Sequence, residues 1–117
     1  MTDFYLVNQH HELIKKFQKD TPWFLNWPIV IATRNEELIG LMGTAVLNGI
    51  FTASLWARSS FVAFKLADKY DSLMKYLGWT YYISVDKENK KWIKAVRRIP
   101  IYKEFDETTS KLWFKRI

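Results

Sequence analysis

The longest hydrophobic feature of the chain is an uncharged run of twenty residues, LIGLMGTAVLNGIFTASLWA, at positions 38–57. A run of this length could cross a bilayer as a helix. However, Asn48-Gly49 lies in its middle, and Asn-Gly between two apolar runs is the strongest short-range signal of a β-hairpin, because both residues tolerate positive φ. We therefore predict that Leu38–Leu47 and Ile50–Ala57 pair as antiparallel strands. A membrane helix is the alternative.

Two later stretches have the periodicity of amphipathic helices. From about Ser60 to Leu77, apolar side chains recur at helical spacing while lysines and aspartates take the other side. Gly78 follows as a suitable C′ residue. A second helix is predicted from about Glu88 to Ile99, where Pro100 ends it. The residues that we expect this second helix to bury are Trp92, Ile93, Val96 and Ile99.

Shorter patterns predict the remaining elements. The segments PIVIATR and WTYYISV indicate strands, and IYKEF and KLWFKRI indicate a closing hairpin across DETTS. Near the beginning, Phe4–Val7 is a candidate edge strand. A helix should follow with Asn8 as its N-cap, an apolar stripe of Leu13, Ile14 and Phe17, and an end at Asp20-Thr21-Pro22. No linker, repeat or low-complexity tract interrupts this series, so we expect one domain over residues 1–117.

The positive charge of the chain is concentrated in one segment, and this indicates a possible binding surface. The formal net charge is +6, and six of the cations gather between residues 87 and 98 opposite a single acid, Glu88. This pattern is typical of a solvated helix face, and it also suits an anion site. On the second interpretation, the residues that would contact a protein or nucleic-acid partner are Lys90, Lys91, Lys94, Arg97 and Arg98.

The chain has no cysteine, which excludes disulfides, thiolate catalysis and the usual structural zinc sites. His10 and His11 are adjacent and diverge on a helix, so we expect no metal. The N-terminus shows no basic start followed by an apolar core. We therefore expect a cytoplasmic protein, in host cytoplasm or a virion if it is viral, and no membrane association.

The predicted order is strand, helix, three-strand meander, helix, strand, helix and hairpin, and it resembles an abbreviated GNAT-superfamily N-acetyltransferase. The strongest local piece is KYDSLMKYLGWTYYISVDKENKKWIKAVRRIPIYKEF. It is similar to the strand–Asn–helix–strand end of GNAT proteins, especially the reduced GNAT-like proteins of tailed bacteriophages. The resemblance implies an α+β fold with a mixed, mainly antiparallel sheet and helices on both faces. It also implies that Asn89 opens the last helix.

The same resemblance places a degenerate cofactor loop at ARSSFVAF. GNAT enzymes carry Gln/Arg-x-x-Gly-x-Gly/Ala there, and its amides, with the helix N-terminus, bind the pyrophosphate of acetyl-CoA. The corresponding residues here are Arg58, Ser59, Ser60, Phe61, Val62 and Ala63. Arg58 and Ala63 fit, whereas Phe61 stands where glycine permits close approach of a phosphate. The alternative is that Ser60 only caps a helix and Phe61 packs in the core.

The catalytic residues are less well defined by the sequence. Acetyl transfer needs alignment of the reactants, a base for the amine and an acid for the leaving thiolate. The usual GNAT acid is a tyrosine within the last helix, which this chain lacks; Tyr102, just beyond it, and Tyr81 or Tyr82 are candidates to replace it. No carboxylate lies on the strand Ile50–Ala57. The carboxylates of Glu36 and Glu37 are expected to be solvated in a turn.

Two functions therefore stay open at this point. One is an acetyl-CoA-dependent N-acetyltransferase with a reduced cofactor loop, favoured by Arg58, Ala63 and Asn89. The other is a catalytically degenerate or non-enzymatic relative, such as a phage accessory or virion protein, that binds a partner through the basic helix. The missing glycine and carboxylate favour the second. The aromatic residues Trp23, Phe24 and Trp27 could line a substrate mouth, form a partner surface or cap the core.

Overall fold

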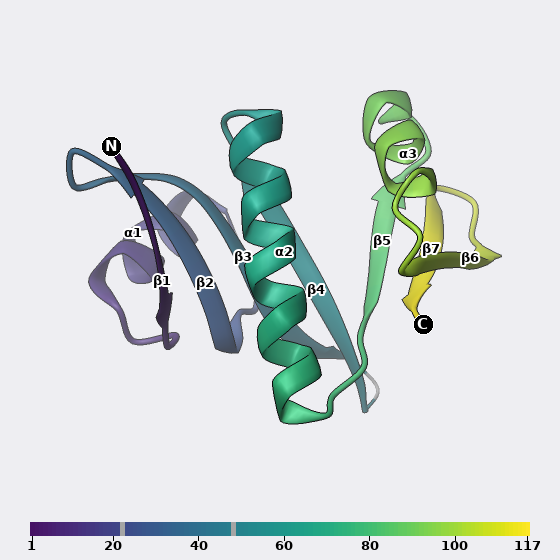
Figure 1. Ribbon diagram of the computed structural model, residues 1–117, viewed down its shortest axis with the longest axis horizontal. Helices are drawn as coiled ribbons and strands as arrows, with labels where there is room; N and C mark the ends of the chain where they lie inside the picture. Colours follow the sequence, from purple (N-terminus) through teal and green to yellow (C-terminus); the bar gives the residue numbers. More distant parts are fainter. Residues whose placement is uncertain (22, 48) are drawn as a thin grey trace.

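The structure is a computed structural model, and it describes residues 1–21, 23–47 and 49–117. Two predicted features, the stop at Pro22 and the turn residue Asn48, lie outside the described residues. The elements in chain order are β1 (Thr2–Val7), α1 (Glu12–Asp20), β2 (Asn26–Arg34), β3 (Glu37–Leu47), β4 (Ile50–Ala57), α2 (Ser60–Leu77), β5 (Tyr82–Asp86), α3 (Lys90–Arg97), β6 (Tyr102–Glu107) and β7 (Lys111–Arg116) (Figure 1).

The strands form one sheet in the order β1-β2-β3-β4-β5-β7-β6. Every neighbouring pair is antiparallel except β4 and β5, which run parallel because α2 connects them. The predicted hairpin is confirmed, with a register that runs from Leu47 opposite Ile50 to Gly40 opposite Ala57. Among the described residues, no helix is long and apolar enough to cross a bilayer.

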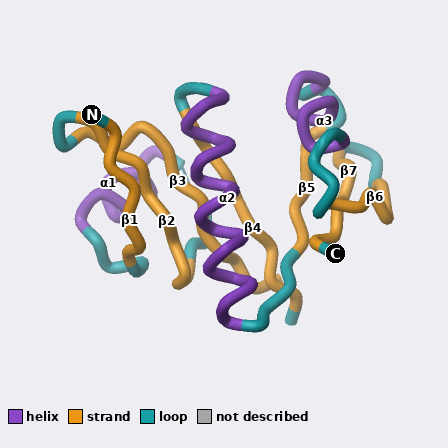
Figure 2. The backbone as a smooth tube through the Cα atoms, in the orientation of Figure 1, coloured by secondary structure: helices purple, strands orange, loops and turns teal. Residues whose placement is uncertain are grey.

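The helices cover both faces of the sheet, as predicted (Figures 1 and 2). On one face, α2 and α3 bury a large cluster that includes Leu66, Tyr70 and Ile93. On the other face, α1 packs Ile14 against the smaller cluster around Ile31 and Leu41. The sheet is therefore the middle layer of three, and any opening through it connects two differently built surfaces.

The contact between α2 and the sheet is close because β3 carries a glycine there. A Cβ atom added at Gly40 would lie 2.7 Å from Leu66 Cδ1 and 2.8 Å from Val62 Cγ1. A Cβ at Gly43, on the opposite face, would lie 2.8 Å from Leu25 Cδ2. These two glycines let both layers approach the central strand, and Gly40 sets the position of the first turns of α2.

Three local predictions were wrong. His11, not Asn8, is the N-cap of α1, and its Nδ1 accepts from the amide of Leu13. Ser59, not Ser60, caps α2 through its hydroxyl. Phe61 does not pack in the core, because its side chain is 61% exposed. The last two cases belonged to the alternative interpretation of the loop, whereas the predicted helix from about Ser60 to Leu77 is confirmed.

Candidate functional site

The parallel strands β4 and β5 diverge. They pair only at Thr52 with Tyr82 and at Ala53 with Ile83, and then separate toward the ends that lead into α2 and α3 (Figure 2). The outer edges of these strands are occupied by β3 and β7. Alternate backbone N–H and C=O groups on the facing edges are therefore left without a strand partner. An extended ligand with its own donors and acceptors could pair with these edges.

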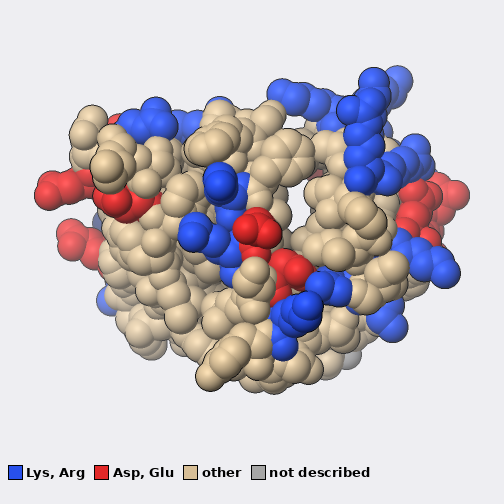
Figure 3. All heavy atoms as spheres, viewed as in Figure 1, with Lys and Arg blue, Asp and Glu red and all other residues tan. Residues whose placement is uncertain are grey.

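The divergence forms a cavity of about 400 Å³, which we call the cleft. Figure 3 shows the opening beside α2, on the side of α3. The cleft takes residues from both faces of the sheet, and its size is that of a small-molecule site. The lining residues are Trp23, Met42, Ala53, Ser54, Leu55, Ala63, Phe64, Ala67, Ile83, Ser84, Val85, Asp86, Asn89, Trp92, Val96, Ile99, Tyr102 and Lys111.

On the helical face, the walls of the cleft come from α2 and α3. Ala63 and Ala67 lie one turn apart on α2, and their small side chains leave space beside the strand. Across the cleft, Asn89 caps α3 by accepting the amide of Trp92 at 3.3 Å. The rings of Phe64 and Trp92 meet edge to face, with centroids 6.4 Å apart. Together these two rings bridge from helix to helix at this entrance.

The opposite entrance is more polar. Because side chains alternate along a strand, Ser54 and Ser84 lie on the α1 face while Ala53 and Ile83 face α2. Asp86 lies two residues beyond Ser84, hence on the same face, and Lys111 contacts its Oδ1 at 3.2 Å. Among the described residues that line the cleft, Asp86 is the one carboxylate. This entrance therefore presents two hydroxyls and an ion pair.

Helix α2 begins just beyond the end of β4, so its N-terminus lies where β4 and β5 have separated. The hydroxyl of Ser59 accepts the amide of Val62 at 3.3 Å, and the carbonyl of Ser59 accepts that of Ala63 at 3.0 Å. The amides of Ser60 and Phe61 have no acceptor within the described chain. Free first-turn amides and the helix dipole attract an anion.

Arg58 is held by an acidic neighbour that the sequence did not assign to it. Its Nη2 lies 2.6 Å from Oε1 of Glu37, and both side chains are more than half exposed, at 52% and 63%. The hydrogen bond from Arg58 and its charge lower the pKa of Glu37. Glu37 is exposed, as predicted, but it begins β3 instead of lying in the turn, and its ion pair with Arg58 was not predicted. Because exposed ion pairs stabilise a protein little, Arg58 is available to exchange Glu37 for another anion.

Tyr102 reaches the cleft from the end of a buried tyrosine chain. Its hydroxyl lies 2.7 Å from that of Tyr81, which in turn donates to Asp71 Oδ1 at 2.9 Å. Arg116 completes the chain by donating to both carboxylate oxygens of Asp71, at 2.7 and 3.0 Å. Burial raises the pKa of Tyr102 to about 12 and also raises the pKa of Tyr81.

The chain has a defined direction. A phenol has one proton, and Tyr81 gives its proton to the carboxylate of Asp71. Tyr102 must therefore donate its own proton to Tyr81, and its oxygen can then only accept further hydrogen bonds. For Tyr102 to donate into the cleft, Tyr81 has to turn its proton from Asp71 to Tyr102. Asp71 would then keep both of its bonds from Arg116.

The cleft brings together some of the predicted site residues and leaves others outside it. Ala63, Asn89 and Tyr102 line it. Arg58, Ser59, Ser60, Phe61 and Val62 do not line it but form the adjoining helix start. Of these, Val62 is buried against the sheet, and the exposed ring of Phe61 lies under the ammonium of Lys65 at 5.8 Å.

Sequence reasoning missed several lining residues. Ser54 and Ser84 read as ordinary strand positions, and Asp86 and Lys111 read as strand ends, because no local pattern shows that β4 and β5 diverge. The helical spacing of Phe64 and Ala67 was the one available signal. The aromatic group before the first meander strand does not form one surface: Trp23 lines the cleft, Trp27 packs against Trp79, and Phe24 is 82% exposed.

Solved structures of N-acetyltransferases share this architecture. An N-acetyltransferase from Staphylococcus aureus Mu50 matches with a TM-score of 0.70 and 12% identity over 98% of this chain and 97% of that one. PaiA N-acetyltransferase from Thermoplasma acidophilum, in complex with coenzyme A, matches with a TM-score of 0.65 and 13% identity over 90% of this chain and 69% of that one. The N-acetyltransferase PseH from Campylobacter jejuni, in complex with acetyl coenzyme A, matches with a TM-score of 0.61 and 13% identity over 98% of this chain and 97% of that one.

The protein therefore has the α+β fold of the GNAT N-acetyltransferases, with a mainly antiparallel sheet of seven strands and three helices among the described residues. The sequence itself matches no protein-family model and no curated protein. The likeness is one of fold, at low sequence identity. What the chain does has to be argued from its own residues.

Proposed function

We propose that the protein binds acetyl-CoA in the cleft and transfers the acetyl group to an amine. The observation that carries this proposal is the divergence of β4 from β5 beside the N-terminus of α2. It offers unpaired strand edges for an extended chain with amide groups, and free helix amides for a pyrophosphate. The coenzyme A and acetyl coenzyme A complexes of proteins with the same fold support this assignment.

The loop fits a pyrophosphate in part. The amides of Ser60 and Phe61 are free, and Arg58 stands directly before them with an exposed guanidinium. Phe61 departs from the GNAT pattern, but its ring lies in solvent and outside the lining of the cleft. The phenyl group therefore borders the anion position and leaves the acyl-binding space open, which is consistent with a reduced cofactor loop that still binds.

When bound, acetyl-CoA supplies an activated acetyl group. The acceptor amine would give its proton to solvent water at the mouth of the cleft, and the protein would have to orient the acetyl group and protonate the leaving thiolate. Asn89 and Tyr102 both line the cleft. We assign orientation to Asn89, and to Tyr102 the role of acid for the leaving thiolate. Tyr102 can act as this acid only when Tyr81 turns its proton from Asp71 toward Tyr102. Arg116 would then keep Asp71 charged and paired.

The acceptor amine would enter from the α1 face. Asp86 places a carboxylate at that entrance, and Ser54 and Ser84 add hydroxyls. Asp86 is exposed and paired with Lys111, and because exposed ion pairs are weak it can exchange this partner for the ammonium group of an amine; the two hydroxyls offer acceptors for its N–H groups. The cofactor and the acceptor would thus approach from opposite sides of the sheet, and alignment within the cleft would supply much of the rate.

Calorimetric titration with acetyl-CoA tests the proposal. Ser84→Tyr, which fills the space between the strands, should abolish binding. Ser72→Tyr, on the exposed side of α2, introduces the same side chain elsewhere and should bind as the wild type does. Melting curves of both variants report whether each is folded. No heat from the wild type at millimolar acetyl-CoA, or equal binding by a folded Ser84→Tyr variant, would refute the assignment.

The experiment also separates an enzyme from a catalytically degenerate relative. Release of the free thiol of CoA in the presence of a panel of primary amines should follow binding if Tyr102 and Asn89 work as assigned. Binding that is intact in wild type and in Tyr102→Phe, without thiol release by either, would indicate a protein that kept the cofactor site and lost the chemistry.

A further inference from the structure

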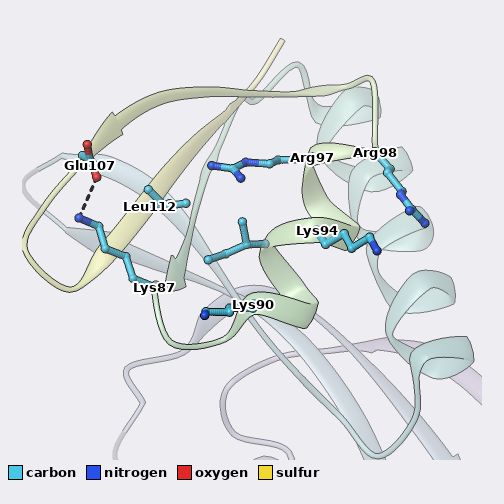
Figure 4. Close-up of a pocket in the computed structure, with 8 residues that line it drawn as sticks. Lys87, Lys90, Lys94, Arg97, Arg98, Glu107 and Leu112 are labelled. Carbon is cyan, nitrogen blue, oxygen red and sulfur yellow. Dashed lines mark ion pairs between the residues drawn. The ribbon is translucent and has the colours of Figure 1, made fainter.

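A second concave surface, which we call the basic hollow, lies on α3 and the hairpin of β6 and β7 (Figure 4). Its volume is about 520 Å³, and its lining residues are Lys87, Lys90, Ile93, Lys94, Arg97, Arg98, Glu107 and Leu112. None of these residues lines the cleft. Helix α3 thus turns one side to the cleft and another to the basic hollow, so the two sites can be tested separately.

Two acidic side chains of β6 pair with cations of the basic hollow, and one of them, Glu107, also lines it. Lys87 Nζ lies 2.7 Å from Glu107 Oε2, and Arg97 Nε lies 2.9 Å from Glu104 Oε1. In these two pairs, the cations donate to carboxylates of an extended strand. Figure 3 shows the consequence on the surface, where Lys and Arg side chains gather over α3 and acidic side chains lie next to them.

The other three cations of the basic hollow have no carboxylate within 4.0 Å among the described residues. They are Lys90, Lys94 and Arg98, four residues apart along α3, and all three are exposed. At 1.5 Å rise per residue, consecutive members of this row are displaced by about 6 Å along the helix axis. Alternate residues of an extended peptide, which share one side, are about 6.6 Å apart.

We propose that the basic hollow binds an extended acidic segment of a partner protein, with carboxylates at alternate positions that pair with Lys90, Lys94 and Arg98. Its carboxylates would pair with the exposed cations of α3 in the same way as Glu104 and Glu107 of β6 pair with Arg97 and Lys87. Recognition of acidic motifs by clusters of cations is a recurring mode of peptide binding. The inference does not depend on acetyl transfer, because it uses no residue of the cleft.

Nucleic acid fits the basic hollow less well. None of its lining residues is aromatic, so it offers no platform on which bases could stack. The row of free cations runs from Lys90 to Arg98, which is eight residue steps or about 12 Å of helix, and this limits contact to a few phosphates. Nucleic-acid affinity grows with the number of phosphates neutralised, whereas a short acidic motif can be satisfied by three cations.

Fluorescence anisotropy tests the proposal with three labelled probes. They are an eight-residue peptide that alternates Glu and Ala, a peptide of the same composition with its four Glu at one end, and a single-stranded RNA of twelve nucleotides. We expect the alternating peptide to bind best at low salt. The double variant Lys90→Glu with Lys94→Glu should weaken it about tenfold or more, which corresponds to 1.4 kcal/mol or more of binding free energy.

The matched control is Lys15→Glu with Lys19→Glu on α1. It has the same spacing and the same change in net charge, both lysines are exposed, and α1 lies away from the basic hollow. This control should leave peptide binding unchanged. An equal loss of affinity in both double variants would show that only the net charge of the protein matters. Tighter binding of the RNA than of the peptide, with the same dependence on Lys90 and Lys94, would show that the partner is a nucleic acid. Either result would overturn the proposal.

Discussion

At the scale of single residues, the buried chain from Arg116 through Asp71 and Tyr81 to Tyr102 is the most consequential feature. Its bonds to Asp71 are charge-assisted, which is the stronger kind of hydrogen bond, and a neutral hydrogen bond between Tyr81 and Tyr102 extends it to a residue that lines the cleft. Its order also predicts unequal roles for two tyrosines that look alike in the sequence. The hydroxyl of Tyr81 has partners on both sides, whereas that of Tyr102 has one partner among the described residues, and Tyr102 lines the cleft.

We therefore expect Tyr81→Phe to be the more damaging substitution for stability. It removes a hydrogen bond to a carboxylate and leaves the proton of Tyr102 without an acceptor, at a cost of about 2–3 kcal/mol. Tyr102→Phe removes one neutral hydrogen bond and should cost about 1 kcal/mol. Urea unfolding of the two variants measures both free energies. A larger loss in Tyr102→Phe would contradict the direction assigned to the chain.

Asp71 makes stability depend on pH in a defined window. Burial opposes ionisation of its carboxyl, but hydrogen bonds from Arg116 and Tyr81 outweigh burial and lower its pKa from the ordinary 3.8. A carboxylate with a lowered pKa stabilises the fold above its unfolded pKa, and this contribution is lost as the pH falls through the folded value. Asp71→Asn should thus destabilise the protein by about 1–3 kcal/mol at pH 7.

The difference between wild type and Asp71→Asn should shrink as the pH falls below 3.8, because the wild-type carboxyl is then itself protonated. Asp68→Asn on the exposed side of the same helix serves as the control and should change stability little at any pH. Unfolding free energies measured from pH 7 to pH 2.5 would show the trend. A difference that stays constant over this range would mean that Asp71 does not act as a charge.

At the scale of elements, α2 is the helix on which the candidate site depends. It packs on Gly40, its first turn provides the free amides, and its small residues Ala63 and Ala67 form a wall of the cleft. A shift of this helix would therefore change both the core and the cofactor loop. Its position relative to β3 and its electrostatic environment at Arg58 can each be tested.

Gly40→Ala should destabilise the protein by about 1–3 kcal/mol, because the new methyl group overlaps Val62 and Leu66 and small-to-large changes in a packed core strain it. Val62→Ala removes one of the colliding groups. In the double variant the cost should accordingly fall below the sum of the two single costs, which a double-mutant cycle in urea would measure. Strict additivity would show that α2 does not lie this close to β3.

The pair of Arg58 with Glu37 gives a prediction about affinity. If Arg58 binds the pyrophosphate, Glu37 competes with it, since both anions need the same guanidinium. Glu37→Gln should then tighten binding of CoA several-fold and Arg58→Ala should weaken it, with little change in melting temperature for either. Glu36→Gln, in the same turn, is the control. Weaker binding in Glu37→Gln would contradict the competition.

The sequence predicted most elements because their signals are local. Asn48-Gly49 between apolar runs, the stripe of α2 with Gly78 behind it, and Asn89 before α3 each determine structure within a few residues. The caps of α1 and α2 were misplaced, because adjacent residues such as Ser59 and Ser60 can both serve as caps and tertiary packing selects between them. The resemblance to bacteriophage proteins stays a prediction.

The site could be predicted only in part, for a physical reason. Ala63, Asn89 and Tyr102 were assigned through family likeness, and the structure brings them to one cleft. The ion pair of Glu37 with Arg58 joins residues 21 positions apart, and that of Asp71 with Arg116 joins residues 45 apart. No periodicity encodes such pairs. The cleft itself arises where two strands stop pairing, which depends on the whole sheet.

At the scale of the whole molecule, the sheet separates two entrances and α3 separates two sites. The cleft opens between the helices on one face and beside Asp86 on the other, while the basic hollow lies on a different side of α3. The net charge of +6 is consistent with both an anionic cofactor and an acidic partner. Only the location of binding distinguishes these uses of the positive charge.

The central claim is that CoA binds in the cleft, and amide chemical shifts measured by NMR during a CoA titration test it most directly, since the protein has a mass of only 14.0 kDa. CoA bound in the cleft should shift the amide signals of Ser60, Phe61 and Asn89 and those along the facing edges at residues 54–57 and 84–86. The amide signals of Lys87 and Arg97 should change little. Shifts confined to the basic hollow, or no shifts at millimolar CoA, would contradict binding in the cleft.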